Sequence, residues 1–226
     1  MTLAIFDLDN TLLNGDSDYL WGRFLGDEGR VDKKFYEIEN QRFYDEYKTG
    51  VLDIFEFLTF SLQPLSEHSM EELAILHQKF MDTTIRPLIT AAARQLLAKH
   101  RDKGDFLLII TATNLFITAP IARELGVNDI IATDAEIKND RYTGKVKGVP
   151  CFREGKVTRL EEWLKHQGQN LAESWFYSDS HNDLPLLERV SYPVAVDPDE
   201  TLADHATARG WPILSLKGRD IITLHP

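Results

Sequence analysis

Two carboxylates, Asp7 and Asp9, stand directly after a short apolar run, Leu3 to Phe6. An apolar run without polar alternation is typical of a parallel strand covered on both faces, and ligands of open α/β sheets bind beyond the carboxyl ends of such strands. Two acids that lie this close repel each other unless a cation or a proton separates them. The pattern therefore predicts a charged site at the end of the first strand, and a simple polar turn is the alternative.

Three further polar clusters stand at comparable positions. Apolar sequences at 106–110 and 175–177 are each followed at once by polar residues, at 111–114 and 178–183, and Gly155-Lys156 opens a helical sequence. A hydroxyl placed just before a helix can bind an anion together with the free N–H groups of that helix. Because the carboxyl ends of parallel strands share one edge of a sheet, we expect all four clusters to converge there.

The converging residue types are those of phosphoryl transfer. Carboxylate oxygens are ligands that suit Mg²⁺, and they come from Asp7, Asp9 and Asp179, with Asp183 behind them. Thr111 and Lys156 would oppose these acids and hold the oxygens of a phosphate group. A carboxylate nucleophile can form an aspartyl-phosphate, and an acid two residues further along can protonate the leaving alkoxide.

The stretch after the first strand has a helical and aromatic character. Residues 19–60 hold 11 of the 23 aromatic residues, and the apolar positions of 35–47 recur every three to four residues, as in an amphipathic helix. From Asp27 to Glu72 there are 12 acids and 5 bases. Helix breaks are predicted at Gly26, Gly29, Gly50 and Pro64, with the last helix starting at Ser66.

Alternating strands and helices resume at Arg86-Pro87, where Pro87 suits the first turn of a helix that reaches Lys103. Further strands are predicted at 129–133, 192–196 and 212–216, helices at 115–125, 155–168 and 201–209, and a hairpin at 135–143. This order indicates an α/β fold with a Rossmann-like parallel sheet. We expect a catalytic core of residues 1–14 plus 86–226 and a helical cap domain, 15–85, inserted after the first strand.

The composition narrows the class of partner. A net charge of −11 argues against binding to nucleic acid or to an anionic membrane, but a small phosphorylated metabolite needs only a local positive site. Cys151 is the single cysteine, so no disulfide forms within the chain. With no leader sequence and no long apolar run, we expect a cytoplasmic protein; the oligomeric state is left open.

The four clusters, in order, resemble the four motifs of the haloacid dehalogenase-like hydrolase superfamily. They read Asp7-Leu-Asp9-Asn-Thr11, then Thr111, then Lys156, then Ser178-Asp179-Ser-His-Asn182-Asp183. A helical insertion between the first two motifs is similar to the cap of the phosphoserine-phosphatase-like branch. The segments Thr-Ala-Thr-Asn, Gly-Lys-Val and Ser-Asp-Ser-His-Asn-Asp resemble the subgroup that includes bacterial histidinol-phosphatases.

The resemblance implies a role for each matching residue. Asp7 would be the nucleophile and Asp9 the acid that later serves as base. The phosphoryl group would be held by Thr111, Lys156, Asn182 and the N–H groups of Leu8, Asp9 and Ala112. Mg²⁺ would be bound by the side chains of Asp7 and Asp179 and by the backbone carbonyl of Asp9, with Asp183 supporting Lys156 or a water on the metal.

The sequence predicts a Mg²⁺-dependent phosphomonoesterase that acts on a small metabolite resembling histidinol phosphate or phosphoserine. The acidity of the cap favours a substrate that carries an amine. Ala112-Thr113-Asn114 replaces the Gly-rich segment of the phosphoserine enzymes, which counts against phosphoserine. The alternatives are a phosphotransferase or mutase of the same fold and a non-enzymatic, receiver-like phospho-acceptor. His181 and Cys151 are expected to be neither metal ligand nor nucleophile.

Overall fold

In the computed structural model, which describes residues 2–225, the chain forms a sheet of eight strands in the order β4-β3-β2-β1-β5-β6-β7-β8. The strands are β1 (Leu3–Phe6), β2 (Phe106–Asn114), β3 (Asp129–Lys138), β4 (Arg141–Lys147), β5 (Trp175–Ser178), β6 (Tyr192–Val196), β7 (Ile213–Ser215) and β8 (Ile222–His225). Six strands pair in parallel, namely β3, β2, β1, β5, β6 and β7, and β4 and β8 are antiparallel additions at the two edges. The predicted α/β fold with a Rossmann-like sheet is confirmed.

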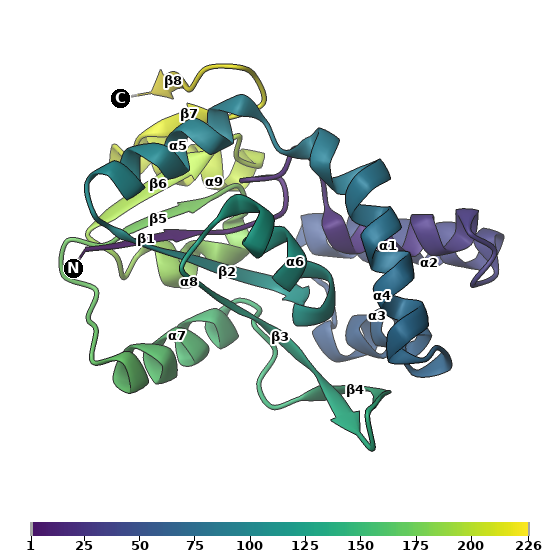
Figure 1. Ribbon diagram of the computed structural model, residues 1–226. Helices are drawn as coiled ribbons and strands as arrows, with labels where there is room; N and C mark the ends of the chain where they lie inside the picture. The colour runs from purple at the N-terminus through teal and green to yellow at the C-terminus, as the bar shows by residue number, and fades with distance from the viewer. Residues whose placement is uncertain (1, 226) are drawn as a thin grey trace.

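Helices cover both faces of this sheet (Figure 1). They are α1 (Ser17–Asp27), α2 (Lys33–Thr49), α3 (Ile54–Glu67), α4 (Met70–Phe80), α5 (Ala91–Asp102), α6 (Leu115–Leu125), α7 (Glu154–Gln167), α8 (Leu184–Leu187) and α9 (Glu200–Arg209). Alternate residues of β1 enter different cores: Ala4 and Phe6 pack with α5 and α6, whereas Leu3 and Ile5 pack with α7, α8 and α9. All four are fully buried, as expected for a strand covered on both faces.

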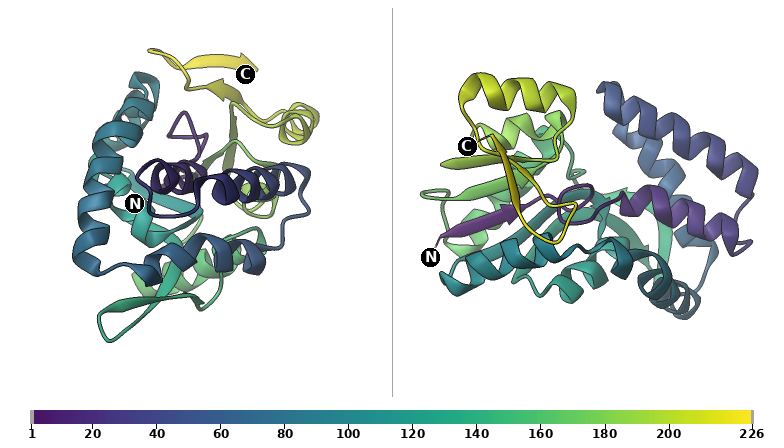
Figure 2. Two further views of the ribbon diagram at one scale, coloured as in Figure 1. Left: turned by 90° about the vertical axis from the view of Figure 1, so that its right-hand side faces the viewer. Right: turned by 90° about the horizontal axis from the view of Figure 1, so that it is seen from above.

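The helices α1 to α4 lie between β1 and β2 in the sequence and beyond the carboxyl ends of the parallel strands in space (Figures 1 and 2). The aromatic side chains of this insertion mostly form its packing: Trp21 and Phe80 join the core under α6, and Phe43 packs against Phe57. The insertion therefore stands over the sheet edge at which the polar clusters were expected. The boundaries 15–85 of a separate cap domain stay a prediction.

Four predicted helix boundaries are wrong for local reasons. Pro87 belongs to a short 3₁₀ turn, Arg86–Leu88, and α5 starts at Ala91 because the Thr90 hydroxyl accepts a hydrogen bond from the Ala93 N–H at 3.0 Å. The helix expected from Ser66 starts instead after Ser69, which forms a reciprocal capping pair with Glu72. Pro64 lies inside α3, and Gly26 inside α1, without ending either helix.

The strands also differ in extent from the prediction. The predicted strand 129–133 and the hairpin after it form one continuous β3, which turns at Asn139-Asp140 into β4. β2 runs on to Asn114, so Thr111 to Asn114 are the end of that strand and not a loop after it. The edge strand β8 was not predicted. No helix within residues 2–225 has the length and apolar character needed to cross a membrane.

Candidate active site

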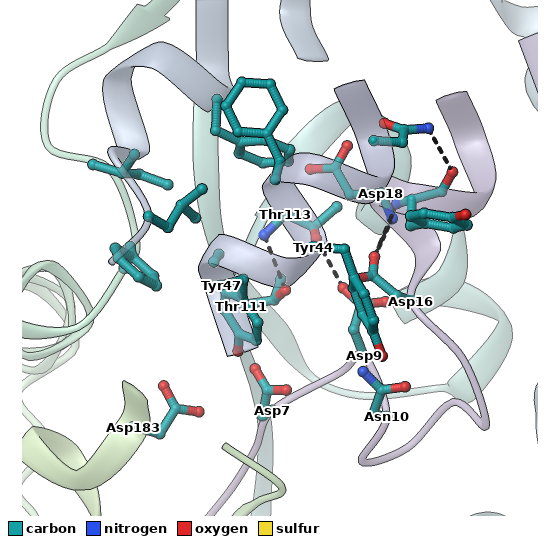
Figure 3. Close-up of a pocket in the computed structure, with 18 of the residues that line it drawn as sticks. Asp7, Asp9, Asn10, Asp16, Asp18, Tyr44, Tyr47, Thr111, Thr113 and Asp183 are labelled. Carbon is teal, nitrogen blue, oxygen red and sulfur yellow. Dashed lines mark hydrogen bonds between the residues drawn. The ribbon is translucent and has the colours of Figure 1, made fainter. Parts of the chain in front are cut away.

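The carboxyl ends of neighbouring strands bring the polar clusters together. β1 lies between β2 and β5, and the N–H of Asp7 continues its ladder by donating to the Tyr177 carbonyl at 2.9 Å. A pocket of about 750 Å³, measured with its open mouth, lies between this edge and the helical insertion. Figure 3 shows Asp9, Asp16 and Asp18 on one side of the pocket and Asp183 on the other.

Lys156 joins two of the predicted acids. Its buried Nζ lies 2.7 Å from Asp7 Oδ1 and 2.8 Å from Asp183 Oδ2. Burial raises the pKa of Asp7 to about 7, and the Lys156 ammonium limits that rise. Burial alone would lower the pKa of Lys156, but Asp183 and Asp7 outweigh it and hold that pKa above its usual value. Lys156 therefore keeps its positive charge beside Asp7.

Asp183 is held in place by Ser178, the first residue of the fourth motif. The Ser178 hydroxyl donates to Asp183 Oδ2 at 2.6 Å, and both residues are buried. Ser178 lies in the fourth motif itself, so its position was visible, but its direction was not. This bond holds the Asp183 carboxylate against the Lys156 ammonium.

The Asp9 side chain points toward the insertion and not toward Lys156. Its Oδ1 accepts the N–H of Ser17 at 2.6 Å, and its Oδ2 accepts the hydroxyl of Thr113 at 2.8 Å. Enclosure by the protein, together with the charge of Asp16, raises the pKa of Asp9 to about 7. A carboxyl group with this pKa can carry a proton at neutral pH and is suited to general acid catalysis. Thr113 lies two residues after Thr111, but the sequence does not predict its contact with Asp9.

The acids near Lys156 fit a divalent cation. Burial and the neighbouring charges of Asp7 and Asp183 raise the pKa of Asp179 well above its usual value, and Thr11 Oγ1 donates to Asp179 Oδ1 at 3.2 Å. A single lysine does not balance three carboxylates, so a cation with oxygen ligands suits this charge distribution. Within residues 2–225, no three His, Cys, Asp or Glu side chains form a ready-made metal site. That Asp7, Asp179 and the Asp9 backbone carbonyl bind this cation stays a prediction.

Three of the four predicted phosphate-binding residues line the pocket, and the fourth, Asn182, does not. Thr111 and Ala112 line the pocket together with Lys156. Asn182 is turned toward the insertion, and its Nδ2 donates to the Tyr47 carbonyl there at 3.2 Å. Its Oδ1 accepts a hydrogen bond from Nε of Arg153, a residue of the core, at 2.9 Å. Its phosphate contact stays a prediction, and it requires Asn182 to exchange the Tyr47 carbonyl for the substrate.

Arg153 is a link between core and insertion that the sequence did not reveal. Besides Asn182, its guanidinium donates to the Gly50 carbonyl at the end of α2. Its backbone has φ of +50°, a conformation that is strained for a residue with a side chain. Arg153 stands immediately before α7, three residues from Lys156, so the same turn that positions Lys156 also attaches the insertion to the core.

His181 and Cys151 both have partners or surroundings within the core. His181 Nδ1 lies 2.8 Å from Asp199 Oδ2. Cys151 is fully buried, and burial raises the pKa of its thiol to about 12. A thiol of that kind is not a nucleophile at neutral pH.

We expect the substitution Gly155→Ala to destabilise the fold and displace Lys156. A Cβ at this position would lie 2.1 Å from the backbone carbonyl oxygen of Pro150, which cannot move as a side chain tip would. Relief of such overpacking costs about 1–3 kcal/mol, so thermal denaturation should show a lower Tm. The matched control is Gly218→Ala, because the added Cβ there meets no other atom and φ is not positive. Gly168→Ala would not serve, because φ of Gly168 is positive and an alanine there is strained. A Tm for Gly155→Ala equal to that of Gly218→Ala would contradict the close approach.

Comparison with known proteins agrees with this geometry. Residues 4–188 match the family model of the haloacid dehalogenase-like hydrolases. A histidinol-phosphatase of Neisseria meningitidis is 48% identical, and the alignment covers 95% of this chain and 99% of that protein. A crystal structure of a protein of unknown function from Bordetella pertussis has 46% identity and a TM-score of 0.89, covering 94% of this chain and 98% of the other.

A phosphoserine phosphatase solved with bound substrate shares the fold, with a TM-score of 0.71 at 20% identity over 97% of this chain and 94% of that chain. The family match spans most of the chain and all four motifs, and its relatives include, besides the histidinol-phosphatase, a phosphoserine phosphatase of Mycobacterium tuberculosis at 32% identity over 93% of this chain and 69% of that protein. The chain is therefore a member of the haloacid dehalogenase-like hydrolases and, within that family, a phosphatase.

Proposed function

We propose that this protein hydrolyses a small, amine-bearing phosphate monoester, with histidinol phosphate as the first candidate, through an aspartyl-phosphate on Asp7. The observation that carries the proposal is the pairing of Asp7 with Lys156 at 2.7 Å beside a second, separately held acid, Asp9, in one pocket. The 48% identical relative named histidinol-phosphatase supports the choice of substrate.

In the first step a carboxylate oxygen of Asp7 attacks phosphorus, and the bond from phosphorus to the ester oxygen breaks. Asp9 gives its proton to the departing alkoxide, so the alcohol leaves neutral. In the second step Asp9, now a carboxylate, takes a proton from water as that water attacks phosphorus. The bond between Asp7 and phosphorus breaks, which releases phosphate and restores both acids.

The charges around Asp7 favour these two reaction steps. Lys156, with Thr111 and the N–H of Ala112, would hold the phosphoryl oxygens, and Asp183 would keep Lys156 in place. Mg²⁺, bound by Asp7, Asp179 and the Asp9 carbonyl, would supply positive charge to the phosphoryl group. A cytoplasmic location belongs to the same proposal, because phosphorylated metabolites are its substrates and the one cysteine is buried and unpaired.

The test is release of inorganic phosphate from a panel of histidinol phosphate, phosphoserine, sugar phosphates and nucleotides. Turnover concentrated on an amine-bearing ester supports the proposal. Phosphate retained in an organic product when an alcohol acceptor is added would instead show a phosphotransferase. Stable labelling by acetyl phosphate with no turnover of any ester would show a phospho-acceptor domain.

For Asp9→Asn we expect turnover to fall by on the order of 10²–10⁴-fold, because the amide cannot supply a proton to the alkoxide. The amide keeps a carbonyl oxygen for the Thr113 hydroxyl or the Ser17 N–H, so the fold should persist. In the burst of released alcohol, which reports the first step alone, the decrease should be smaller for an ester with a good leaving group, such as p-nitrophenyl phosphate, which needs no acid. An equal decrease of this burst for both esters would remove the acid role from Asp9.

A further inference from the structure

The Asp18 carboxylate, in the first turn of α1, is buried in the pocket without a partner. The residue is 8% exposed, and its Oδ2 has no hydrogen bond within the described residues. The start of α1 does not need it, because Asp16 Oδ1 already accepts the N–H groups of Asp18 and Tyr19. The positive end of the helix dipole favours a carboxylate here but does not replace the hydrogen bonds that burial removes. Asp18 therefore needs a partner that the described part of the chain does not provide.

The surroundings of Asp18 add to its need for a positive charge. Asp9 and Asp16 lie on the same side of the pocket (Figure 3), and with burial they hold the pKa of Asp18 well above its usual value. Among the described residues that line the pocket, Lys156 is the single basic one, and it is already paired with Asp7 and Asp183. The part of the pocket away from Lys156 is thus acidic and contains no base.

The remaining walls favour an organic cation. Tyr19 and Tyr44 stand 5.7 Å apart between ring centroids, and Phe43, Phe57 and Phe152 line the same pocket. Aromatic faces attract ammonium and similar groups, whereas a metal ion needs several further oxygen ligands.

We propose that Asp18 is the counter-ion for a protonated amine on the leaving alcohol, and that the pocket selects phosphate esters of amino alcohols that carry no carboxylate. This inference rests on the proposed phosphatase function and specifies its substrate class. With the ester's phosphate at Lys156, a neighbouring carboxylate on the leaving alcohol would meet Asp16 and Asp18 with no base to bind it.

The first test compares esters on the unmodified protein. 2-Aminoethyl phosphate and ethyl phosphate differ by the amine alone, and phosphoserine adds a carboxylate to the first. A hydrogen bond to a charged group is worth on the order of 10- to 100-fold in affinity, so kcat/KM should favour 2-aminoethyl phosphate over ethyl phosphate by about that ratio. Phosphoserine should be a poorer substrate than 2-aminoethyl phosphate.

The second test is Asp18→Asn, with Asp45→Asn as the matched control, since Asp45 is an exposed acid of the same insertion. The ratio of kcat/KM for the two ethyl esters should fall by on the order of 10- to 100-fold in Asp18→Asn and stay unchanged in Asp45→Asn. Because Asn has nearly the same shape as Asp and has no charge to bury, Tm of Asp18→Asn should not fall.

The outcomes separate this inference from the proposed function. Turnover of both ethyl esters with no preference for the amine, or a preference that survives Asp18→Asn, would overturn the role of Asp18 and leave the phosphatase intact. No phosphate release from any ester would remove the proposed function itself. A lack of preference for the amine in the unmodified protein overturns the inference even if Asp18→Asn fails to fold.

Discussion

Asp7→Asn should lower phosphate release by on the order of 10⁴–10⁶-fold, the range found when a catalytic nucleophile is removed. The amide keeps the shape of the carboxylate but has no negative oxygen with which to attack phosphorus. Lys156 keeps its second partner, Asp183, at 2.8 Å, and one of the three acids around it becomes neutral. We therefore expect Asp7→Asn to lose activity while it stays folded.

Phosphate release and a thermal denaturation curve, measured on the same preparation, check this prediction. A cooperative transition near that of the unmodified protein together with absent turnover is the expected result. Asp102→Asn, which removes an exposed carboxylate at the end of α5, is the control for the same change in net charge. Turnover by Asp7→Asn comparable with that of the unmodified protein would exclude Asp7 as nucleophile.

Removal of divalent metal should abolish turnover and lower Tm. Asp7, Asp179 and Asp183 repel one another with Lys156 as their one cation, so a bound Mg²⁺ stabilises the folded state. At a Mg²⁺ concentration 100 times its dissociation constant, the gain in unfolding free energy is about 2.7 kcal/mol. The measurement is a Tm titration with Mg²⁺ after treatment with EDTA, with phosphate release followed in parallel.

Asp179→Asn is the variant that links this stabilisation to the site. It removes one of the two proposed carboxylate ligands, so the Mg²⁺-dependent rise in Tm should disappear or require much more Mg²⁺. Asp197→Asn changes an acid whose partners are Ser215 Oγ, the Leu216 N–H and Lys217 Nζ, so it should keep the rise. Full turnover in EDTA would contradict a metal-assisted reaction.

The amino-acid sequence predicted best those site residues that directly follow an apolar strand. Leu3 to Phe6 has no polar alternation, and its residues are buried on both faces of the sheet, so the placement of Asp7 at a sheet edge followed from the pattern. The parallel order of β2, β1 and β5 then brought Thr111 and Asp183 to the same edge. These placements depend on strand direction, which an apolar run reveals.

Side-chain direction was the part that the sequence could not reveal. Asp7 and Asp9 are two positions apart, yet one bonds Lys156 and the other bonds Thr113 and the N–H of Ser17, because the chain turns between them. The Arg153 contact with Gly50 depends on how the insertion docks, and no local pattern marks it. Helix starts failed for a related reason: Ser66 and Ser69 are both plausible caps, and Glu72 decided between them.

The most direct measurement is mass spectrometry of the protein quenched with acid during turnover of histidinol phosphate, or of whichever panel ester is turned over fastest. We predict one phosphoryl group on the peptide that contains Asp7, absent from Asp7→Asn and present at a higher level in Asp9→Glu if hydrolysis of the intermediate is slowed. Steady release of phosphate with no phosphoryl group on the protein, or with the group on another residue, would contradict the aspartyl-phosphate at Asp7.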